Sequence, residues 1–245
     1  MGICADLRKG SGIILFRAEK NYGIIYPCYR DGSVNREIKL KLSGEIANGV
    51  EGGINKMEIK IEKLVSDMVD DYLHYFDHIA FKDHEEWSSC YCLESHLLKG
   101  ENEAMEEKSL RRDKAKELIC SGVMQGYLVY DGDEVVGWCN VGDKTDYEPI
   151  MANNEYETLK VCKGKVKAIY CFEIAPESRG KGITHLLLDK IIQDAKEEGY
   201  SYIEGYPFLD KNFEYQYHGP VHLYEKHGFK MIAEKSWFCI MQKEL

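Results

Sequence analysis

Hydrophobic and polar positions change their spacing most clearly between residues 166 and 199. Residues 166–175 are mostly apolar, aromatic or β-branched, which predicts a strand that stops at Pro176. From Ile183 the apolar positions recur at helical spacing until Gly199 ends the run. Between the two lies the turn Arg179-Gly180-Lys181-Gly182. A glycine-rich turn at a helix N-terminus presents N–H groups and the positive end of the helix dipole, so this segment predicts an anion site and a ligand that carries phosphate.

The spacing elsewhere predicts a mixed sheet with helices. The expected elements are a strand at 57–64, helices at 65–80 and 109–121, strands at 125–130 and 134–141, a strand at 201–207, a helix at 221–227, and strands at 229–233 and 235–242. Residues 101–108 are charged and are expected to be an exposed segment. Residues 143–165 show weak periodicity, which predicts a long insertion that is either a lid or disordered.

Residues 1–56 do not match the rest of the chain. They offer two short candidate strands, at 12–16 and 22–26, among glycine-rich and polar stretches. Residues 51–57 could be encoded by a purine-rich stretch that resembles a bacterial ribosome-binding site before a start codon. We therefore divide the chain into an extension over 1–56 and one domain over 57–245, with Met57 as a hypothetical natural start. The alternative is a native extension that packs on the domain.

Composition narrows the class of protein. No apolar run approaches the roughly 20 residues that span a bilayer, and the N-terminus lacks the apolar stretch of a signal peptide, so a cytoplasmic protein without membrane contact is expected. The nine cysteines are expected to be free thiols, and Cys90-x-Cys92 is too tight for the usual zinc pair, so no metal site is predicted. The net charge of -10 argues against nucleic acid as a ligand. It favours a cationic acceptor, although solubility alone explains many acidic surfaces.

Two common glycine motifs do not fit the turn. A Walker loop needs a different spacing and a hydroxyl after its lysine, and a dinucleotide fingerprint needs a glycine where His185 stands. The stretch instead resembles the pyrophosphate loop of the GNAT superfamily of acetyl-CoA-dependent N-acetyltransferases, Arg/Gln-x-x-Gly-x-Gly/Ala, filled here by Arg179, Gly182 and Thr184. Thr184 departs from the usual small residue. A second match, LYEKHGF around Tyr224, follows in the order and spacing of the family.

The resemblance implies an α/β (α+β) fold, with a mixed, mostly antiparallel central sheet flanked by helices and a cofactor site where the fourth and fifth strands splay apart. It implies that the acetyl-CoA contacts come from Phe172, Ile174, Arg179, Gly180, Lys181, Gly182, Ile183 and Thr184. It places Tyr224 as the general acid near the sulfur, where a phenol with a pKa of about 10 suits a thiol with a pKa of about 8.5. Family members often have an asparagine where this chain has Tyr217.

The general base and the acceptor contacts are less defined. Glu173 lies on the cofactor strand in phase with Cys171, and partial burial would raise its pKa, so it is the first candidate for the base. Glu204 and His218 are its rivals, and many members of the superfamily have no dedicated base. In GNAT folds the segment after the first strand borders the acceptor site. Three of its residues are therefore candidate substrate contacts, namely Trp87, Tyr91 and His96.

The leading prediction is an N-acetyltransferase that moves an acetyl group from acetyl-CoA to the primary amine of a small cationic molecule. The first alternative is a non-catalytic acyl-CoA-binding module that senses acyl-CoA, which would keep the glycine turn without needing Tyr224. The second is a structural domain that has lost its cofactor, supported only by Thr184 and Tyr217. The oligomeric state is not readable from the sequence, but the last strands of such sheets often pair between subunits, which leaves a homodimer open.

Overall fold

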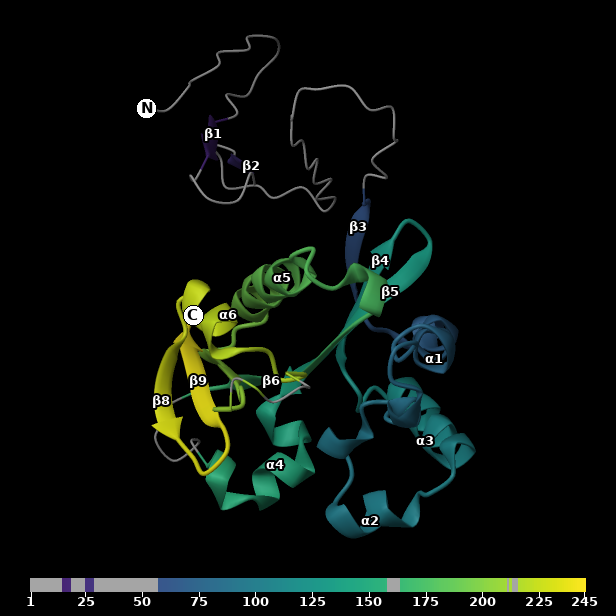
Figure 1. Cartoon of the computed structure of the whole chain (residues 1–245). Helices are drawn as coiled ribbons and strands as arrows, with labels where there is room; N and C mark the ends of the chain where they lie inside the picture. Colours follow the sequence, from purple (N-terminus) through teal and green to yellow (C-terminus); the bar gives the residue numbers. More distant parts are fainter. Residues whose placement is uncertain (1–14, 19–24, 29–56, 158–163, 211, 213–215) are drawn as a thin grey trace. The chain divides into compact units, whose positions relative to one another are not determined.

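A computed structural model describes residues 15–18, 25–28, 57–157, 164–210, 212 and 216–245. The chain divides into two compact units, residues 1–60 and 61–245, and each is described by itself (Figure 1). In the first unit, β1 (Leu15–Ala18) and β2 (Ile25–Cys28) form an antiparallel pair close to the two expected short strands. The rest of the 1–56 extension lies outside the described residues, and the start at Met57 stays a prediction.

One sheet of seven strands organises the larger unit, in the spatial order β3-β4-β5-β6-β7-β9-β8. β6 and β7 are parallel, whereas β5 is antiparallel to β4 and β6, and β9 is antiparallel to β7 and β8. The strands are β3 (Ile59–Lys63), β4 (Gly126–Asp131), β5 (Glu134–Asp143), β6 (Val166–Ile174), β7 (Tyr202–Gly205), β8 (Lys230–Glu234) and β9 (Cys239–Glu244). The predicted fold, a mixed and mostly antiparallel sheet flanked by helices, is confirmed.

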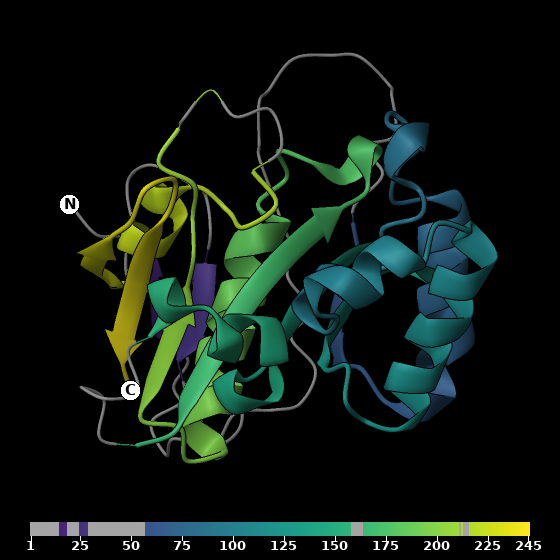
Figure 2. The same cartoon turned by 90° about the horizontal axis from the view of Figure 1, so that it is seen from below.

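Helices cover both faces of this sheet. Tyr127 of β4 donates to Asp194 of the helix α5, whereas Trp138 of β5 meets the α1 ring Tyr72 edge-on at 5.0 Å. Because Tyr127 pairs with Cys139, the residue next to Trp138, α5 and α1 pack on opposite faces (Figure 2). The helices are α1 (Val69–His78), α2 (Lys99–Ala104), α3 (Lys108–Cys120), α4 (Glu148–Ala152), α5 (Ile183–Glu197) and α6 (Val221–Lys226).

One stretch agrees with its prediction and one differs. The charged residues 101–108 are mostly exposed as predicted, and they include part of the short helix α2, in which the Glu101 side chain accepts the Leu98 N–H at 3.0 Å and satisfies one of the helix's first donors. In the predicted insertion, the described residues 143–157 form α4 and short 3₁₀ turns instead of an irregular loop. Its buried side chains Tyr147, Ile150 and Tyr156 belong to a core cluster that also contains Ala168 of β6, Ile240 of β9, Tyr206 and Phe238. Apolar burial therefore orders this stretch.

Candidate functional site

The sheet opens between β6 and β7. Residues 166–169 of β6 pair with residues 202–205 of β7, and no pair continues beyond Ile169 and Gly205. At the same point the register of β6 against β5 shifts by one residue, which leaves Tyr170 as a bulge. The bulge increases the local twist and turns the last residues of β6 away from β7. The fourth and fifth strands of the domain thus diverge as predicted.

The glycine turn lies after this open end, at the start of α5. Gly180 and Gly182 have φ values of +74° and +80°, and no atom lies within 4 Å of the position that a Cβ would take at either residue. Ile183 and Thr184 begin α5, where the first N–H groups of a helix have no intrahelical acceptor. The turn therefore offers open space, backbone donors and the positive end of a 15-residue helix, with exposed Lys181 beside it. These residues fit a pyrophosphate.

Arg179 opens the turn, but its side chain is directed to the end of β6. Its Nε donates to the Ile174 carbonyl at 2.9 Å, and its guanidinium contacts the carboxylates of Asp83 and Glu173. The predicted role of Arg179 at the phosphate site stays a prediction, because in this structure its side chain makes these contacts at the end of β6. The carboxylates of Asp83 and Glu173 both contact the guanidinium, and Lys181, between the two glycines, is exposed.

Glu173 lies on the α1 face of β6. It pairs across the strands with Trp138, whose ring packs on α1, and its carbonyl accepts the Tyr75 hydroxyl at 2.9 Å. Burial raises the pKa of Glu173 to about 8, although the nearby Arg179 opposes the rise. A carboxyl group with this pKa is a stronger base than an ordinary glutamate, and it can accept a proton once the pH rises toward 8 and deprotonates it.

Tyr224 lies on the other side of the opening, directly over Gly205. A Cβ on Gly205 would stand 2.2 Å from a Tyr224 ring carbon, so only glycine lets the ring come this close. The hydroxyl donates to the His218 carbonyl at 2.6 Å, and the side chain is fully buried. Burial raises the pKa of Tyr224 well above its ordinary value, so the phenol keeps its proton. A glycine inside an apolar strand marks such a close approach, a signal that the sequence analysis did not use.

A family model described as the acetyltransferase (GNAT) family matches residues 82–229, more than half of the chain. The chain belongs to the GNAT family. The predicted resemblance is confirmed, and acetyl-CoA is the acyl donor of this family. Solved structures of similar fold include the PaiA N-acetyltransferase from Thermoplasma acidophilum in complex with coenzyme A, at 13% identity over 77% of this chain and 100% of that one, with a TM-score of 0.48.

Two further GNAT-fold structures are about as distant. A GNAT-family acetyltransferase from Streptococcus pneumoniae has 13% identity over 77% of this chain and 99% of its own, with a TM-score of 0.44. An N-acetyltransferase from Staphylococcus aureus Mu50 has 16% identity over 76% of this chain and 97% of its own, with a TM-score of 0.41. No curated protein matches the sequence. The family assignment rests on the family model alone.

In this GNAT domain, residues 216–219 cover the open edge of β6, and we call them the covering segment. The Phe172 N–H donates to the Tyr217 carbonyl at 2.6 Å, and the His218 ring contacts the Tyr170 carbonyl. Gly219, at a φ of +76°, packs against the Phe172 ring. Two polar groups of β6 that would otherwise face the opening are thus taken by the chain itself, and one of them is the backbone N–H of a predicted cofactor-contact residue, Phe172.

The three candidate acceptor contacts differ in exposure: two are partly exposed and one is buried. Trp87 follows Asp83 by four positions, is partly exposed and stacks on His84 at 4.2 Å. His96 is partly exposed and its Nε2 lies 3.3 Å from the Asn140 amide, while burial lowers its pKa to about 4. Tyr91, by contrast, is fully buried and donates to Asp77 at 2.5 Å, so it is a core residue rather than a substrate contact.

Glu204 and His218, the rival candidates for the base, are also interior residues, and their side chains contact other groups of the protein. The Glu204 carboxylate accepts from the Lys144 ammonium at 2.7 Å and from Gln242 at 2.8 Å, and both members of the ion pair are almost completely buried. This pair satisfies a buried charge in the core. Burial lowers the pKa of His218 to about 4, so its ring is neutral and serves the covering segment.

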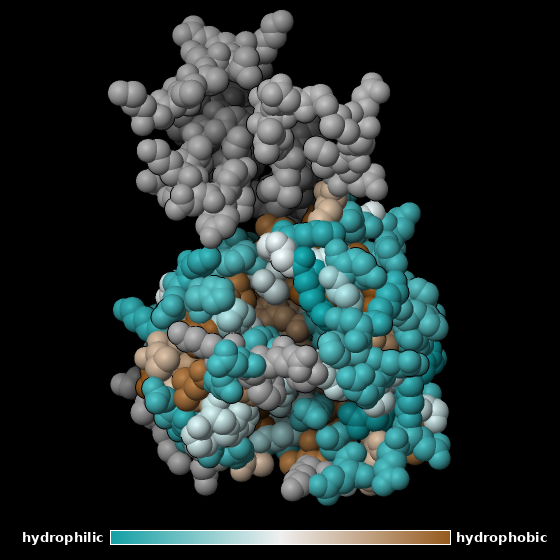
Figure 3. Space-filling model, viewed as in Figure 1, coloured by the Kyte–Doolittle hydropathy of each residue, from teal (hydrophilic) through white to brown (hydrophobic). Residues whose placement is uncertain are grey.

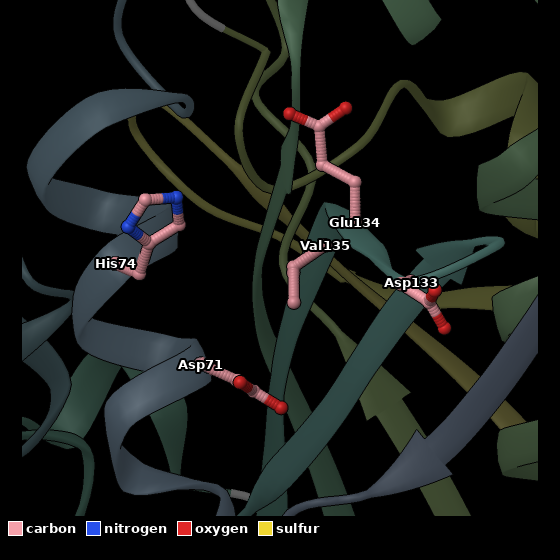
Figure 4. Close-up of a pocket in the computed structure, with 5 residues that line it drawn as sticks. All are labelled: Asp71, His74, Asp133, Glu134 and Val135. Atoms are coloured by element: carbon pink, nitrogen blue, oxygen red, sulfur yellow. The ribbon is translucent and has the colours of Figure 1, made fainter.

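A separate hollow lies between α1 and the β4–β5 turn. Asp71, His74, Asp133, Glu134 and Val135 line its volume of about 330 Å³, with the acidic groups on both walls (Figure 4). Its negative charge does not suit a phosphate ligand. On the face shown in Figure 3, hydrophobic residues lie recessed among hydrophilic ones near the middle of the larger unit.

Within the described ranges, no three His, Cys, Asp or Glu side chains are placed to hold a metal ion, and no helix is long and apolar enough to cross a membrane.

Proposed function

We propose that this chain transfers the acetyl group of acetyl-CoA to a primary amine by direct attack, and that the acceptor is a small cationic molecule. The observation that carries the proposal is the open glycine turn at the α5 N-terminus, which follows directly on the diverging end of β6. The substrate acetyl-CoA supplies the thioester, and the chain supplies the phosphate contacts and the two proton-transfer groups.

Glu173 and Tyr224 serve opposite proton transfers in this proposal. Glu173, with a pKa of about 8, accepts the proton that the amine loses as its nitrogen bonds to the acetyl carbon. Tyr224 keeps its proton at neutral pH and supplies it to the thiolate as the carbon–sulfur bond breaks. Glu173 lies on β6 and the Tyr224 ring packs on Gly205 of β7, so the two groups belong to the two diverging strands, which supports an acyl transfer between them.

The acceptor preference follows from charge. The segment next to Glu173 carries Asp83, Glu85 and Glu86, all at the surface, and Trp87 adds a partly exposed aromatic ring. Carboxylates and an aromatic face attract a cation. A polyamine, an aminoglycoside-like molecule or a lysine side chain each has that chemistry. A homodimer and the expected cytoplasmic location stay predictions.

The alternative remains a non-catalytic acyl-CoA-binding module. One observation favours it, because the covering segment occupies the Phe172 N–H and accepts the Tyr224 hydroxyl. Such a module would bind acyl-CoA without turnover. For the enzyme, residues 216–219 must move when the acyl donor enters.

Calorimetric titration of the full chain with acetyl-CoA, with ATP and NAD as controls, tests the shared first step. Micromolar binding of acetyl-CoA alone supports both proposals, and no binding to the folded protein would reject both. A thiol-release assay with spermidine, kanamycin and a lysine-containing peptide then separates them. Release that depends on one of these amines supports the enzyme, whereas binding without release from any primary amine supports the module.

A further inference from the structure

The Arg179 guanidinium lies between the carboxylates of Asp83 and Glu173 and is closer to that of Asp83. Its Nη1 makes a short contact with Asp83, and its Nη2 lies 3.4 Å from one oxygen of Asp83 and 3.4 Å from one oxygen of Glu173. A tight charge-assisted N–H···O bond measures about 2.7–2.9 Å, so the pairing of Arg179 with Glu173 is loose. The main ion pair of the guanidinium is therefore the one with Asp83.

The backbone fixes this arrangement from one side. The Arg179 Nε donates to the Ile174 carbonyl at 2.9 Å, which anchors the guanidinium at the end of the strand that carries Glu173. Because Nε is bonded to this carbonyl, only Nη1 and Nη2 can pair with a carboxylate, either that of Asp83 or that of Glu173. Asp83 lies in the segment after α1, in a different element, and its side chain is 35% exposed. It draws the cation away from Glu173.

We propose that Asp83 is a positioning residue for the acetyl transfer: by holding Arg179, it prevents a tight Arg179–Glu173 ion pair and leaves the Glu173 carboxyl available as a proton acceptor. The inference rests on the proposed role of Glu173 as the base. Asp83 touches neither the acyl donor nor the acceptor in this proposal and acts only through Arg179.

The surroundings of Glu173 give the direction of the effect. Burial is the main cause of its raised pKa, Arg179 lowers that pKa and Asp83 raises it. The titratable and charged groups that face it from the neighbouring elements are Arg179, Asp83, Tyr75, Cys171 and Cys90. Among these, Arg179 is the cation, and Asp83 is the group that controls where this cation lies.

The test titrates Glu173 directly and needs no substrate. The full chain is labelled with ¹³C at the glutamate carboxyl carbon, and the Glu173 signal is assigned by its loss in Glu173→Gln. Asp83→Asn should lower the midpoint of this signal by about one pH unit, because Arg179 then closes on Glu173, and Arg179→Gln should raise it by about as much. Asp83→Glu, which still reaches Arg179, should keep the wild-type midpoint.

Glu85→Gln is the matched control, because it removes one exposed negative charge two positions from Asp83. Its midpoint should stay within about 0.3 of the wild type, as expected for a screened surface charge. An Asp83→Asn midpoint equal to that of Glu85→Gln would overturn the inference. A wild-type midpoint near the ordinary 4.5 would instead remove Glu173 from the role of base, and the inference would fall with it. Acetyl-CoA titration of the wild type separates both outcomes from a failure of the proposed function.

Discussion

The two halves of β6 form one continuous strand but have different neighbours. Residues 166–169 pair with β7 on one edge, and residues 167–169 also pair with β5 on the other, so this half of the strand lies inside the sheet. Residues 171–174 pair with β5 alone, and on the second edge the covering segment contacts the Phe172 N–H and the Tyr170 carbonyl. The bulge at Tyr170 separates the halves.

This difference shows how one strand provides both stability and a site. In the first half, the Lys167 side chain is buried, and its ammonium contacts Glu198 at 2.5 Å and lies 4.6 Å from the centre of the Tyr200 ring. In the second half, Glu173 has a raised pKa, and the Phe172 N–H bonds to a loop rather than to a strand. Groups paired within the sheet, as in the first half, stabilise the fold. Groups bonded to a loop, such as the Phe172 N–H in the second half, can exchange that partner for a ligand.

The largest expected effect comes from closing the anion site beyond the second half. Gly182→Glu places a carboxylate among the N–H groups that would hold phosphate and a side chain at a φ of +80°. Acetyl-CoA binding should weaken more than about 100-fold, because like charges repel strongly at such short distances. Calorimetry measures it.

Gly132→Glu is the control for that change. Gly132 has a φ of +62° in the β4–β5 turn and also has open space around it, so the backbone cost is similar. Its affinity for acetyl-CoA should match the wild type. Equal losses in both variants would show that strain, not the phosphate site, explains the effect.

The second effect concerns the acid. Tyr224→Phe removes the hydroxyl but keeps the ring over Gly205, so kcat should fall about 100-fold while acetyl-CoA still binds. Stability should fall by about 1 kcal/mol for the lost hydrogen bond. Tyr72→Phe, which loses a buried hydroxyl bond of 2.9 Å to the Tyr91 carbonyl, should show the same stability loss with unchanged kcat. If both variants keep kcat, Tyr224 is not the acid.

The sequence predicted the first half of β6, the glycine turn and α5 well, because apolar periodicity and glycine spacing are local signals. The divergence of β6 and β7 came from the family resemblance, and the pairing confirms it. The predicted order of strands and helices also holds in the larger unit, apart from α2 and α4.

Non-local contacts could not be predicted in the same way. Nothing near Asp83 in the chain indicates that it meets Arg179, which is 96 positions away. Tyr91 was a candidate substrate contact because of its segment, and Glu204 was a candidate base, but each is buried and bonded to a partner distant in the sequence. A polar side chain can be buried only when it has a hydrogen-bond or ion-pair partner, and a single sequence does not show which distant residue is that partner.

The third prediction concerns the pH dependence of kcat/KM, which distinguishes a general base at Glu173 from a glutamate with only a structural role. In the wild type, kcat/KM should rise with pH to a plateau above about 8, because the base acts only when deprotonated. Glu173→Gln should abolish this rise and lower kcat/KM about tenfold at pH 9, with little change at pH 6, where Glu173 is already protonated. An unchanged pH–rate profile would remove Glu173 from the role.

The same variant has a signature in stability. The folded-state pKa of Glu173 is raised above 4.5, so the folded state holds a proton that the unfolded state releases between pH 4.5 and about 8. Wild-type stability should therefore fall as the pH rises through this window. Glu173→Gln has no such proton to lose, so it should gain stability relative to the wild type across the window in thermal unfolding.

The smallest effect on transfer is expected from Glu198, which is bound to the first half of β6. Burial alone would raise its pKa, but hydrogen bonds from Lys167 and Lys63 lower it below the ordinary value, the opposite of Glu173. The stabilising contribution of Glu198 is thus present above pH 4.5 and is lost as the pH falls through its lowered pKa.

Glu198→Gln should lower the free energy of unfolding by about 1 kcal/mol at pH 7, since the carboxylate is partly solvated. The cost should vanish in acid, and kcat and acetyl-CoA affinity should not change. A loss of transfer in this variant would mean that the two halves of β6 are coupled, and the contrast drawn between them would not hold.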